Sequence, residues 1–402
     1  MKIGIVGLDF NSGNKGCEAL AYSFLAILND LSKKNNEVIE TYLLQKLPTK
    51  KFIKEGLSLT KVYEYYEPKI KYSNLKIKYI LLLHTSSHIF YSSKISKLDY
   101  VIDFTSGDSF SDIYGLDRFY ARTKFKESIL NHKVPLILGS QTIGPFEDEE
   151  AGKYAGKIIN KCKEVFVRDK LSYECVEKIA NRKSILTTDV AFALPYKKVE
   201  RKEKRKIRIG FNPSGLLWNG GYLGNNQFKL TVDYKKYCDK IISMLINDKS
   251  FEVHIILHSF ENNNNNISDN DLVPALEINR KYPSTILSPM FDSCSDAKSY
   301  ISSMDVFIGA RMHATIAAYS SYVPVIPFAY SRKFEGLYNS IGYNYILDGK
   351  KMTTDECIKK SIEWIKNKEK LMESIEEGHK IIDTKIEIFK KELEKIIFEK
   401  ND

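Results

Sequence analysis

The stretch from Asp305 to Gly336, DVFIGARMHATIAAYSSYVPVIPFAYSRKFEG, constrains the fold more than any other part of the sequence. Apolar runs at 306–308 and 323–328 are separated by a glycine turn and a segment of small residues. This pattern predicts two parallel strands joined by a crossover helix. Ligands bind such sheets outside the carboxyl ends of the strands, so we expect a binding site formed by the residues that follow each strand.

Polar and basic side chains follow both predicted strands of this unit: Arg311 and His313 follow the first, and Tyr330, Ser331, Arg332 and Lys333 follow the second. Two cation-bearing loops at one sheet edge predict an anionic ligand. Residues two apart on a regular helix point roughly 200° apart. Arg311 and His313 can therefore meet one ligand only if Arg311 lies in the turn and His313 in the first helical turn. A histidine there can act as general acid or base, and a structural histidine is the alternative.

Strand and helix patterns alternate through the rest of the chain and begin afresh near residue 207. This alternation predicts an α/β protein with two doubly wound, Rossmann-like domains. The length of 402 residues also favours two cores over one. We predict a first domain at 1–198, a basic linker at 199–208 and a second domain at 209–375. A C-terminal helix at 376–402 follows, and packing back onto the first domain is one option for it.

Composition and charge narrow the class of protein. A hydrophobic fraction of 43% is typical of a soluble globular chain, and the net charge of +10 admits nucleic acid, phosphorylated metabolites or an anionic membrane surface as partners. The basic run 197–208 lacks interleaved aromatic residues, which favours a solvated linker over nucleic-acid contact. The six scattered cysteines form no CxxC pair, which favours a reduced compartment and argues against structural zinc.

The opening residues read as a strand, without the apolar region of a secretory signal, so a cytoplasmic location is expected. The most apolar window, 79–91, is too short to span a bilayer. A buried core helix is the favoured interpretation of this window, and an interfacial helix is the alternative. Peripheral association with the inner membrane face stays open. Residues 48–95 otherwise give no readable pattern.

Other polar residues follow predicted strands. Gly13 and Gly16 precede a helix, either as an anion-binding turn or as a tight strand–helix connection. Arg168 and Asp169 either pair and cap a helix, or the guanidinium faces a carboxylate or phosphate.

His258 ends a buried strand and is either a site residue or a core histidine. A glycine loop after another strand could bind sugar hydroxyls through Asp103, Ser106 and Asp108. No metal-binding motif or nucleophile elbow is found.

Several of these blocks together resemble one family, the polysaccharide pyruvyl transferases. The blocks, in order, are GNKGCEAL at 13–20, GSQTIGPF at 139–146, VRDKLSYE at 167–174, TTDVAFAL at 187–194, and GARMHATIAA with VPVIPFAYSRKFEGL within 309–337. The resemblance spans about residues 5 to 340. The chain departs from the expected pattern near Ser140 and Gln141, where a second glycine or a similar small residue is expected.

The resemblance implies two Rossmann-like domains facing a central cleft, as in glycosyltransferases of the B type. It implies phosphoenolpyruvate as donor, a sugar of a surface polysaccharide or its lipid-linked precursor as acceptor, and a pyruvate ketal and phosphate as products. No metal or organic cofactor is required. By motif match, Arg168, Arg311 and His313 would meet the donor, with His313 as the catalytic acid–base. We add residues 331–333 to the donor side. Residues considered for the acceptor or the rest of the cleft are Asn14, Asp103, Ser106, Asp108, Gln141, His258 and Glu335.

Two other functions stay open. A nucleotide-sugar-dependent glycosyltransferase of the same architecture would need a carboxylate for the ribose, and Glu335 is the candidate. A non-catalytic scaffold of polysaccharide assembly could be recruited to the membrane by its basic surface.

Overall fold

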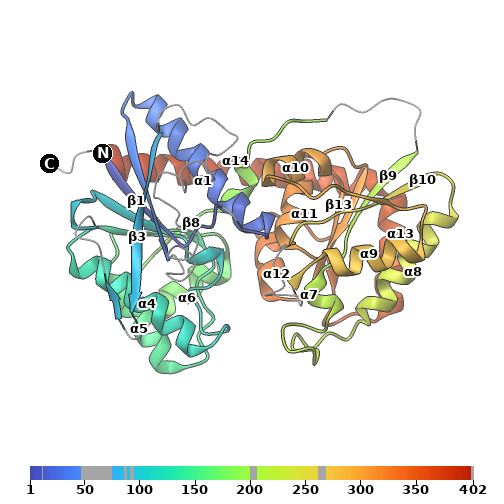
Figure 1. Ribbon diagram of the computed structural model, residues 1–402, viewed down its shortest axis with the longest axis horizontal. Coiled ribbons are helices and arrows are strands. Elements are labelled where there is room, and N and C mark those ends of the chain that lie inside the picture. The colour runs from blue at the N-terminus through green and yellow to red at the C-terminus, as the bar shows by residue number, and fades with distance from the viewer. Residues whose placement is uncertain are drawn as a thin grey trace. The chain divides into compact units, whose positions relative to one another are not determined.

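The computed structural model describes residues 1–10, 12–46, 75–85, 88–90, 95–199, 206–260 and 269–399 (Figure 1). The chain divides into two compact units, each built from separate parts of the sequence. The first unit comprises Met1–Asn11, Leu20–Val190 and Thr384–Asp402. The second unit comprises Ser12–Ala19 and Ala191–Asp383.

The first unit is built on an eight-stranded sheet in the order β4-β3-β2-β1-β5-β6-β7-β8. The described strands pair in parallel, except that β3 and β4 are antiparallel. The strands are β1 (Lys2–Val6), β2 (Ile39–Lys46), β3 (Leu75–Thr85), β4 (His88–Phe90), β5 (Tyr100–Asp103), β6 (Leu136–Gln141), β7 (Glu164–Val167) and β8 (Ile185–Leu186). Helices flank the sheet: α1 (Lys15–Lys34), α4 (Leu116–Asn131), α5 (Glu149–Lys161) and α6 (Lys170–Ala180) (Figure 1).

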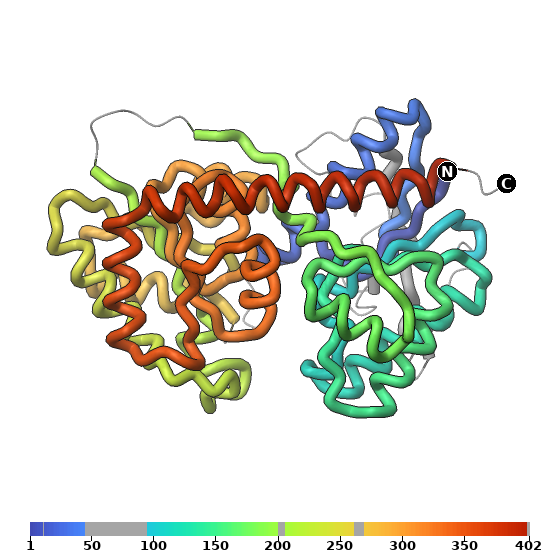
Figure 2. Tube along the Cα trace, turned by 180° about the vertical axis from the view of Figure 1, so that it is seen from behind, coloured from blue at the N-terminus to red at the C-terminus, as the bar shows by residue number. Residues whose placement is uncertain are grey.

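The core of the first unit lies where apolar strands meet these helices. All six residues of β6 are buried, as expected for a central parallel strand with both faces covered. Gly139 within β6 has no room for a side chain, because a Cβ there would lie 2.6 Å from the Phe104 ring. The long helix α14 (Lys368–Phe398), red in Figure 2, adds Phe389, whose ring lies 4.9 Å from that of Phe166.

The helix predicted for the apolar window 79–91 is wrong. Residues Leu75–Thr85 form β3, which pairs with β2 over eight residues, and His88–Phe90 form β4. The window begins within the alternating pattern LKIKYI, which has the period of a strand. Pairing with the edge of β2 therefore prevails over the helix propensity of the leucines that follow.

The second unit contains a six-stranded parallel sheet in the order β11-β10-β9-β12-β13-β14. Its strands are β9 (Ile207–Asn212), β10 (Phe251–Ile255), β11 (Ile286–Leu287), β12 (Val306–Gly309), β13 (Val325–Ala329) and β14 (Leu347–Asp348). Its helices are α7 (Gly215–Trp218), α8 (Tyr234–Asn247), α9 (Leu272–Lys281), α10 (Cys294–Ile301), α11 (Met312–Tyr319), α12 (Arg332–Asn339) and α13 (Thr354–Lys366). The predicted α/β class with two doubly wound sheets is confirmed.

The strand–helix–strand unit predicted at 306–328 is confirmed as β12, α11 and β13. The two strands pair in parallel, with Phe307 opposite Val325 and Gly309 opposite Pro327. Seven of the eight residues of α11 are buried, which explains why its small residues show no amphipathic stripe. Rigid packing of α11 fixes the turn that precedes it.

Lys298 on α10 is a buried cation of the second unit. Its Nζ donates to the carbonyl oxygen of Leu194 at 2.9 Å and lies 4.7 Å from the centre of the Tyr196 ring. Burial lowers the pKa of Lys298 to about 7, opposed weakly by Cys294. The folded chain therefore binds fewer protons here than the unfolded chain between pH 7 and the ordinary lysine pKa, so stability rises with pH across that window.

Lys298→Met is accordingly expected to change the pH dependence of folding. The gain from the substitution, relative to wild type, should be about 2–3 kcal/mol larger at pH 7 than at pH 9. Urea unfolding at both pH values measures the difference, and Lys380→Met, at an exposed position of α14, is the control. An identical shift at the two pH values would show that Lys298 titrates normally.

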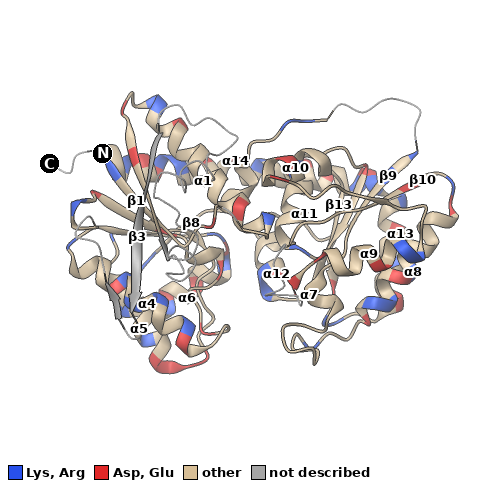
Figure 3. Cartoon of the chain, in the orientation of Figure 1, with Lys and Arg blue, Asp and Glu red and all other residues tan. Residues whose placement is uncertain are grey.

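Charged residues of both signs are distributed over both units (Figure 3). Among the described residues, no helix combines the length and the apolar character that crossing a bilayer requires.

Candidate functional site

The two sheets each contain a point where the strand order reverses. In the second unit this point lies between β9 and β12, which are neighbours in the sheet although distant in sequence. Open parallel sheets bind ligands at the carboxyl ends of the strands at such a point. Asn212 ends β9 and Arg311 follows β12, and the Asn212 Oδ1 accepts a hydrogen bond of 3.2 Å from the Arg311 backbone N–H.

The expected backbone geometry of Arg311 and His313 is confirmed. Arg311 is the residue before α11, with an extended backbone (φ −90°, ψ 119°), and α11 begins at Met312. His313 therefore lies in the first turn of the helix while Arg311 lies outside it. Because Arg311 lies outside the helix, the two side chains do not have to point in the nearly opposite directions that one continuous helix would require.

The Arg311 guanidinium is buried and held by two carboxylates. Its Nε and Nη2 donate to the Asp271 Oδ1 at 3.0 and 2.7 Å. Its Nη1 forms a short ion pair with the Asp269 side chain, and its Nη2 also donates to the Asp269 carbonyl oxygen at 2.8 Å. Burial alone would lower the pKa of Arg311, but Asp271 and Asp269 outweigh it and raise the pKa well above its ordinary value. Most of the donor capacity of Arg311 is thus engaged within the chain.

Asp271 is the centre of this network. Besides Arg311, its carboxylate accepts from the backbone N–H of Gly215 at 2.9 Å and of Ser259 at 3.0 Å, and from the Asn212 Nδ2 at 3.2 Å. The side chain is fully buried. Three loops after strands are therefore joined through one carboxylate. Sequence reasoning missed Asp269 and Asp271; the signal available was that a buried arginine requires a carboxylate partner.

His258 lies at the same sheet edge and is buried. Its pKa is well below the ordinary histidine value because of burial first, and then because of the positive groups His313, Arg311 and Lys15. Its Nδ1 has no hydrogen-bond partner among the described residues. We therefore infer that His258 is neutral at pH 7.

The start of α1 belongs to this site. The Lys15 backbone N–H donates to the His258 carbonyl oxygen at 2.9 Å, and Asn14 forms a bridge with Ser259. The Asn14 Oδ1 accepts from the Gly16 N–H at 2.9 Å, so Asn14 shapes the turn before the helix. Residues 12–19 are thus tied to the loop after β10.

Gly16 is required by its contact with His313. A Cβ at position 16 would lie 2.6 Å from the His313 Nδ1 and 2.8 Å from its Cβ, closer than real atoms approach. The imidazole therefore rests on the backbone of α1. Only glycine permits this approach without a shift of α1 or α11.

Gly16→Ala is expected to displace His313. We expect destabilisation of about 1–3 kcal/mol from the forced shift and a fall of at least about tenfold in turnover if His313 is catalytic. The matched control is Gly152→Ala within α5, where a Cβ meets its nearest neighbour at 3.5 Å. Thermal unfolding and activity of both variants measure the effect. Equal stability and equal activity of the two variants would show that Gly16 is not required for the position of His313.

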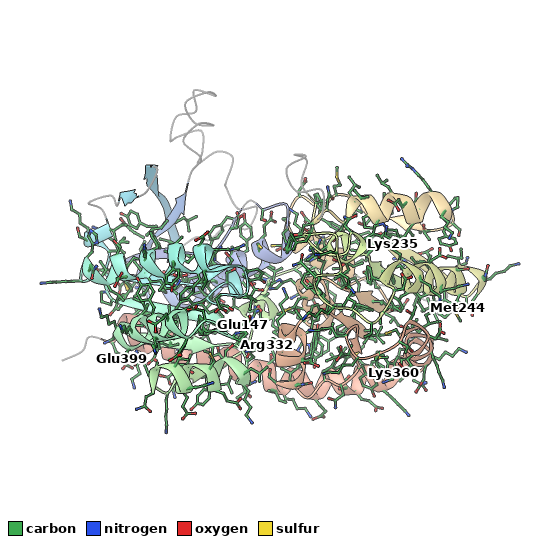
Figure 4. All side chains as sticks on the ribbon, turned by 90° about the horizontal axis from the view of Figure 1, so that it is seen from below. Glu147, Lys235, Met244, Arg332, Lys360 and Glu399 are labelled. Atoms are coloured by element: carbon green, nitrogen blue, oxygen red, sulfur yellow. The ribbon has the colours of Figure 1, made fainter. Side chains whose placement is uncertain are left out.

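The loop after β13 leads into α12, which begins at Arg332 (labelled in Figure 4). Ser331 precedes the helix with an extended backbone, yet its hydroxyl forms no capping hydrogen bond. Among the described residues, the buried Ser331 Oγ and Arg332 Nη2 have no hydrogen-bond partner. Lys333 lies over the Tyr330 ring at 5.9 Å, and Glu335 pairs with Lys351 at 2.8 Å. The first turn of α12 therefore keeps polar groups that are not engaged.

Tyr222 links this loop to Arg311. The Tyr222 side chain is 48% exposed, and its pKa is raised to about 12 by partial burial first and then by the Asp269 carboxylate, while Arg311 and Lys333 oppose the shift. The charges of Asp269, Arg311 and Lys333 thus all act on the Tyr222 hydroxyl. Tyr222 was not predicted as a site residue; its glycine-rich loop gave no specific signal.

Arg168 belongs to the first unit. It is buried, its Nη1 donates to the Asp189 Oδ2 at 2.6 Å, and its Nε donates to the Thr142 Oγ1 at 2.8 Å. Asp169 caps α6 instead, by accepting from the Ser172 N–H at 2.8 Å. The predicted Arg168–Asp169 pair is therefore wrong, whereas the predicted cap on the helix is confirmed for Asp169. The three sequence blocks around Gln141, Arg168 and Asp189 meet here.

The remaining predicted acceptor residues also lie in the first unit. Asp103 forms a buried ion pair with Lys126 at 2.9 Å, and its carbonyl oxygen accepts from the Gln141 Nε2 at 2.6 Å. The Asp108 carboxylate accepts from the Tyr114 hydroxyl at 2.9 Å. Among the described residues, no group of three or more His, Cys, Asp or Glu side chains could hold a metal ion.

Comparisons with known proteins bear on this arrangement. A family model described as polysaccharide pyruvyl transferase matches residues 14–332. No curated protein matches the chain in sequence. In fold, the chain is similar to Anabaena HepE in complex with UDP, with 9% identity, a TM-score of 0.55 and coverage of 99% of each chain.

A second similar structure is UDP-GlcNAc 2-epimerase from Neisseria meningitidis bound to UDP-GlcNAc, with 13% identity, a TM-score of 0.52 and coverage of 96% of this chain and 99% of that chain. The enzyme of that name from Methanocaldococcus jannaschii has 11% identity, a TM-score of 0.50 and coverage of 90% and 92%. These likenesses place the fold with the B-type glycosyltransferases and epimerases, and at such low identity they show the fold alone.

Proposed function

The chain belongs to the polysaccharide pyruvyl transferase family, and we propose that it transfers pyruvate from phosphoenolpyruvate to two hydroxyls of a sugar, forming a ketal and releasing phosphate. The observation that carries the proposal is the position of His313, in the first turn of α11 at the point where the strand order reverses. An imidazole there can exchange protons near neutral pH beside an anion held at helix N-termini.

We propose that the donor anion is held at the first turn of α12. The Ser331 Oγ and Arg332 Nη2 lack partners among the described residues, and helix N-termini attract anions. Lys333 adds a further positive charge. Arg311 keeps a place in the donor site with a changed role: its charge is balanced by Asp271 and Asp269, so it positions the surrounding loops more than it binds the donor. Arg168 is proposed as a donor residue on the family motif.

The proposed reaction has two bond-forming steps. A protonated His313 gives its proton to the methylene carbon as an acceptor hydroxyl oxygen bonds to the central carbon, and the hydroxyl proton leaves to solvent or a base. The bond from the central carbon to the phosphate oxygen then breaks, and phosphate leaves with the electron pair. The second sugar hydroxyl bonds to the same carbon and loses its proton, which completes the ketal.

Incubation with phosphoenolpyruvate and a panel of sugar acceptors tests the proposal. We expect phosphate release only when a suitable acceptor is present, and protection against thermal unfolding by phosphoenolpyruvate alone. The control is an equal concentration of inorganic sulfate, which carries charge without the enol group. The proposal fails if no acceptor elicits phosphate release and phosphoenolpyruvate protects no better than sulfate.

A nucleotide-sugar-dependent glycosyltransferase is the second candidate, favoured by the fold shared with proteins solved with UDP or UDP-GlcNAc. The ribose carboxylate predicted for that function, Glu335, lies in the first turn of α12 and pairs with Lys351. Thermal protection by UDP, with none by phosphoenolpyruvate, would favour this function. Glu335→Gln should then reduce protection by UDP.

A further inference from the structure

The first unit contains a pocket of about 490 Å³ that its own residues form. Its lining includes Val6–Asp9 at the end of β1, and Asp103, Thr105 and Ser106 at the end of β5. β1 lies between β2 and β5 in the sheet, so the strand order reverses at this position. The pocket therefore occupies the place where an open parallel sheet binds ligands, and its volume is that of a small-molecule site.

Helix α4 gives this pocket a basic wall. Arg118, Arg122 and Lys126 recur every fourth residue, so they share one face of the helix, and all three line the pocket. α4 is labelled in Figure 1 and its basic residues are blue in Figure 3. Lys126 is neutralised by Asp103 at 2.9 Å. The two arginines are the cations that can meet a ligand.

The two arginines are held in place by neutral groups. The Arg122 Nη1 donates to the Ser106 Oγ at 3.2 Å, and the Arg118 Nη2 donates to the Ser109 Oγ at 3.2 Å. Arg118 also lies over the Tyr114 ring at 5.0 Å. Neither forms an ion pair within the part of the chain that the structure describes. Burial, followed by the charge of Arg118, lowers the pKa of Arg122, and the carboxylates of Asp103 and Asp108 oppose this shift.

The backbone beside the arginines is strained. Thr105 and Ser106 both have positive φ, at 43° and 57°. Such values are uncommon for residues other than glycine and are costly for a β-branched residue, and strain of this kind gathers at ligand sites. The Ser106 N–H donates to the Gly7 carbonyl oxygen at 2.7 Å, which joins the loops after β1 and β5. The strained turn presents the Ser106 hydroxyl to Arg122.

The rest of the pocket suits a sugar. Leu44, Ala121 and Phe125 provide an apolar wall, while Asp9 and Ser106 provide oxygen atoms that can meet hydroxyls. The planar guanidinium groups match the oxygens of a phosphate. From this combination we infer that the pocket binds a phosphorylated sugar, with the phosphate on Arg118 and Arg122. The identification of this ligand as the acceptor rests on the proposed function; the site itself does not.

Titration calorimetry with hexose 1-phosphate and inorganic pyrophosphate tests the site. We expect both to bind the wild-type chain, and Arg122→Gln to weaken binding at least tenfold. Arg122→Lys should give an intermediate loss, because it keeps the charge without the planar fork. Lys124→Gln, at an exposed position of α4 outside the pocket, is the matched control and should bind as wild type does. Circular dichroism confirms that each variant is folded.

Two further probes distinguish sources of the phosphate. Tighter binding of a short-chain polyprenyl diphosphate sugar than of UDP assigns the site to a lipid-linked sugar, and the reverse order assigns it to a nucleotide. No binding by any probe, or an equal loss in Arg122→Gln and Lys124→Gln, overturns the inference. Protection by phosphoenolpyruvate is measured on the same variants: if it is absent while sugar phosphate binds, the proposed donor fails and the pocket stands.

Discussion

Replacement of His313 by alanine is expected to reduce pyruvate transfer by about 10²–10⁴-fold, the range associated with loss of a general acid–base group. His313 is the proposed proton donor to the methylene carbon, and an alanine cannot replace it. Protection by phosphoenolpyruvate should persist, because the proposed anion contacts come from Ser331, Arg332 and Lys333. Single-turnover phosphate release, with thermal unfolding in the presence of phosphoenolpyruvate, separates chemistry from binding.

The variant must also remain folded for this result to be informative. The His313 ring rests on Gly16, so its removal leaves space between α1 and α11 and should cost about 1–3 kcal/mol. His313→Asn retains a polar side chain and reduces that cost. His132→Ala provides an exposed histidine control in the first unit. Wild-type turnover in both His313 variants would exclude His313 from the reaction.

The sequence was sufficient to predict the arrangement around β12 and α11. The apolar runs, the glycine and the small residues specify a parallel strand–helix–strand unit, and helix geometry required Arg311 to leave the helix. Both the strand–helix–strand unit and the position of Arg311 depend on the local sequence pattern and on the period of about 3.6 residues of the α-helix. The prediction for the segment 75–85 was wrong for a related reason. The alternation LKIKYI has the period of a strand, but the leucines that follow it are compatible with a helix or a strand.

The partners of the buried cations could not be predicted. Arg311 meets Asp271 forty residues earlier in the chain, and Arg168 meets Asp189 rather than the adjacent Asp169. Charge pattern shows which residues need a partner but not which carboxylate the fold brings to them. The segment before Asp269 also reads as a polar low-complexity loop, which conceals the two carboxylates at its end. Sequence therefore identified the cations of the site and missed the network that holds them.

That network makes Asp271 the residue whose loss should destabilise the chain most. Asp271→Ala would leave the Nε of the buried Arg311 guanidinium and the N–H groups of Gly215 and Ser259 without their acceptor, and Asp269 would be the remaining carboxylate partner of Arg311. Breaking a buried ion pair from one side costs about 3–5 kcal/mol, a large part of the 5–15 kcal/mol that stabilises a typical domain. Urea unfolding measures the loss. The control is Glu377→Ala, which breaks an exposed ion pair with Lys380 and should cost at most about 1 kcal/mol.

A double-mutant cycle then separates the pair from its surroundings. Arg311→Met alone should also destabilise the chain, because it leaves Asp271 as a buried charge. The double variant Asp271→Asn with Arg311→Met removes both charges, so its cost should fall below the summed costs of the matched single variants, Asp271→Asn and Arg311→Met, by about 1–3 kcal/mol. Additive costs would mean that the ion pair is not the source of stability. If Arg311 mainly positions the loops, protection by phosphoenolpyruvate should fall in each single variant and recover partly in the double variant. If Arg311 contacts the donor directly, protection should instead be lost in the Arg311→Met variant and stay lost in the double variant.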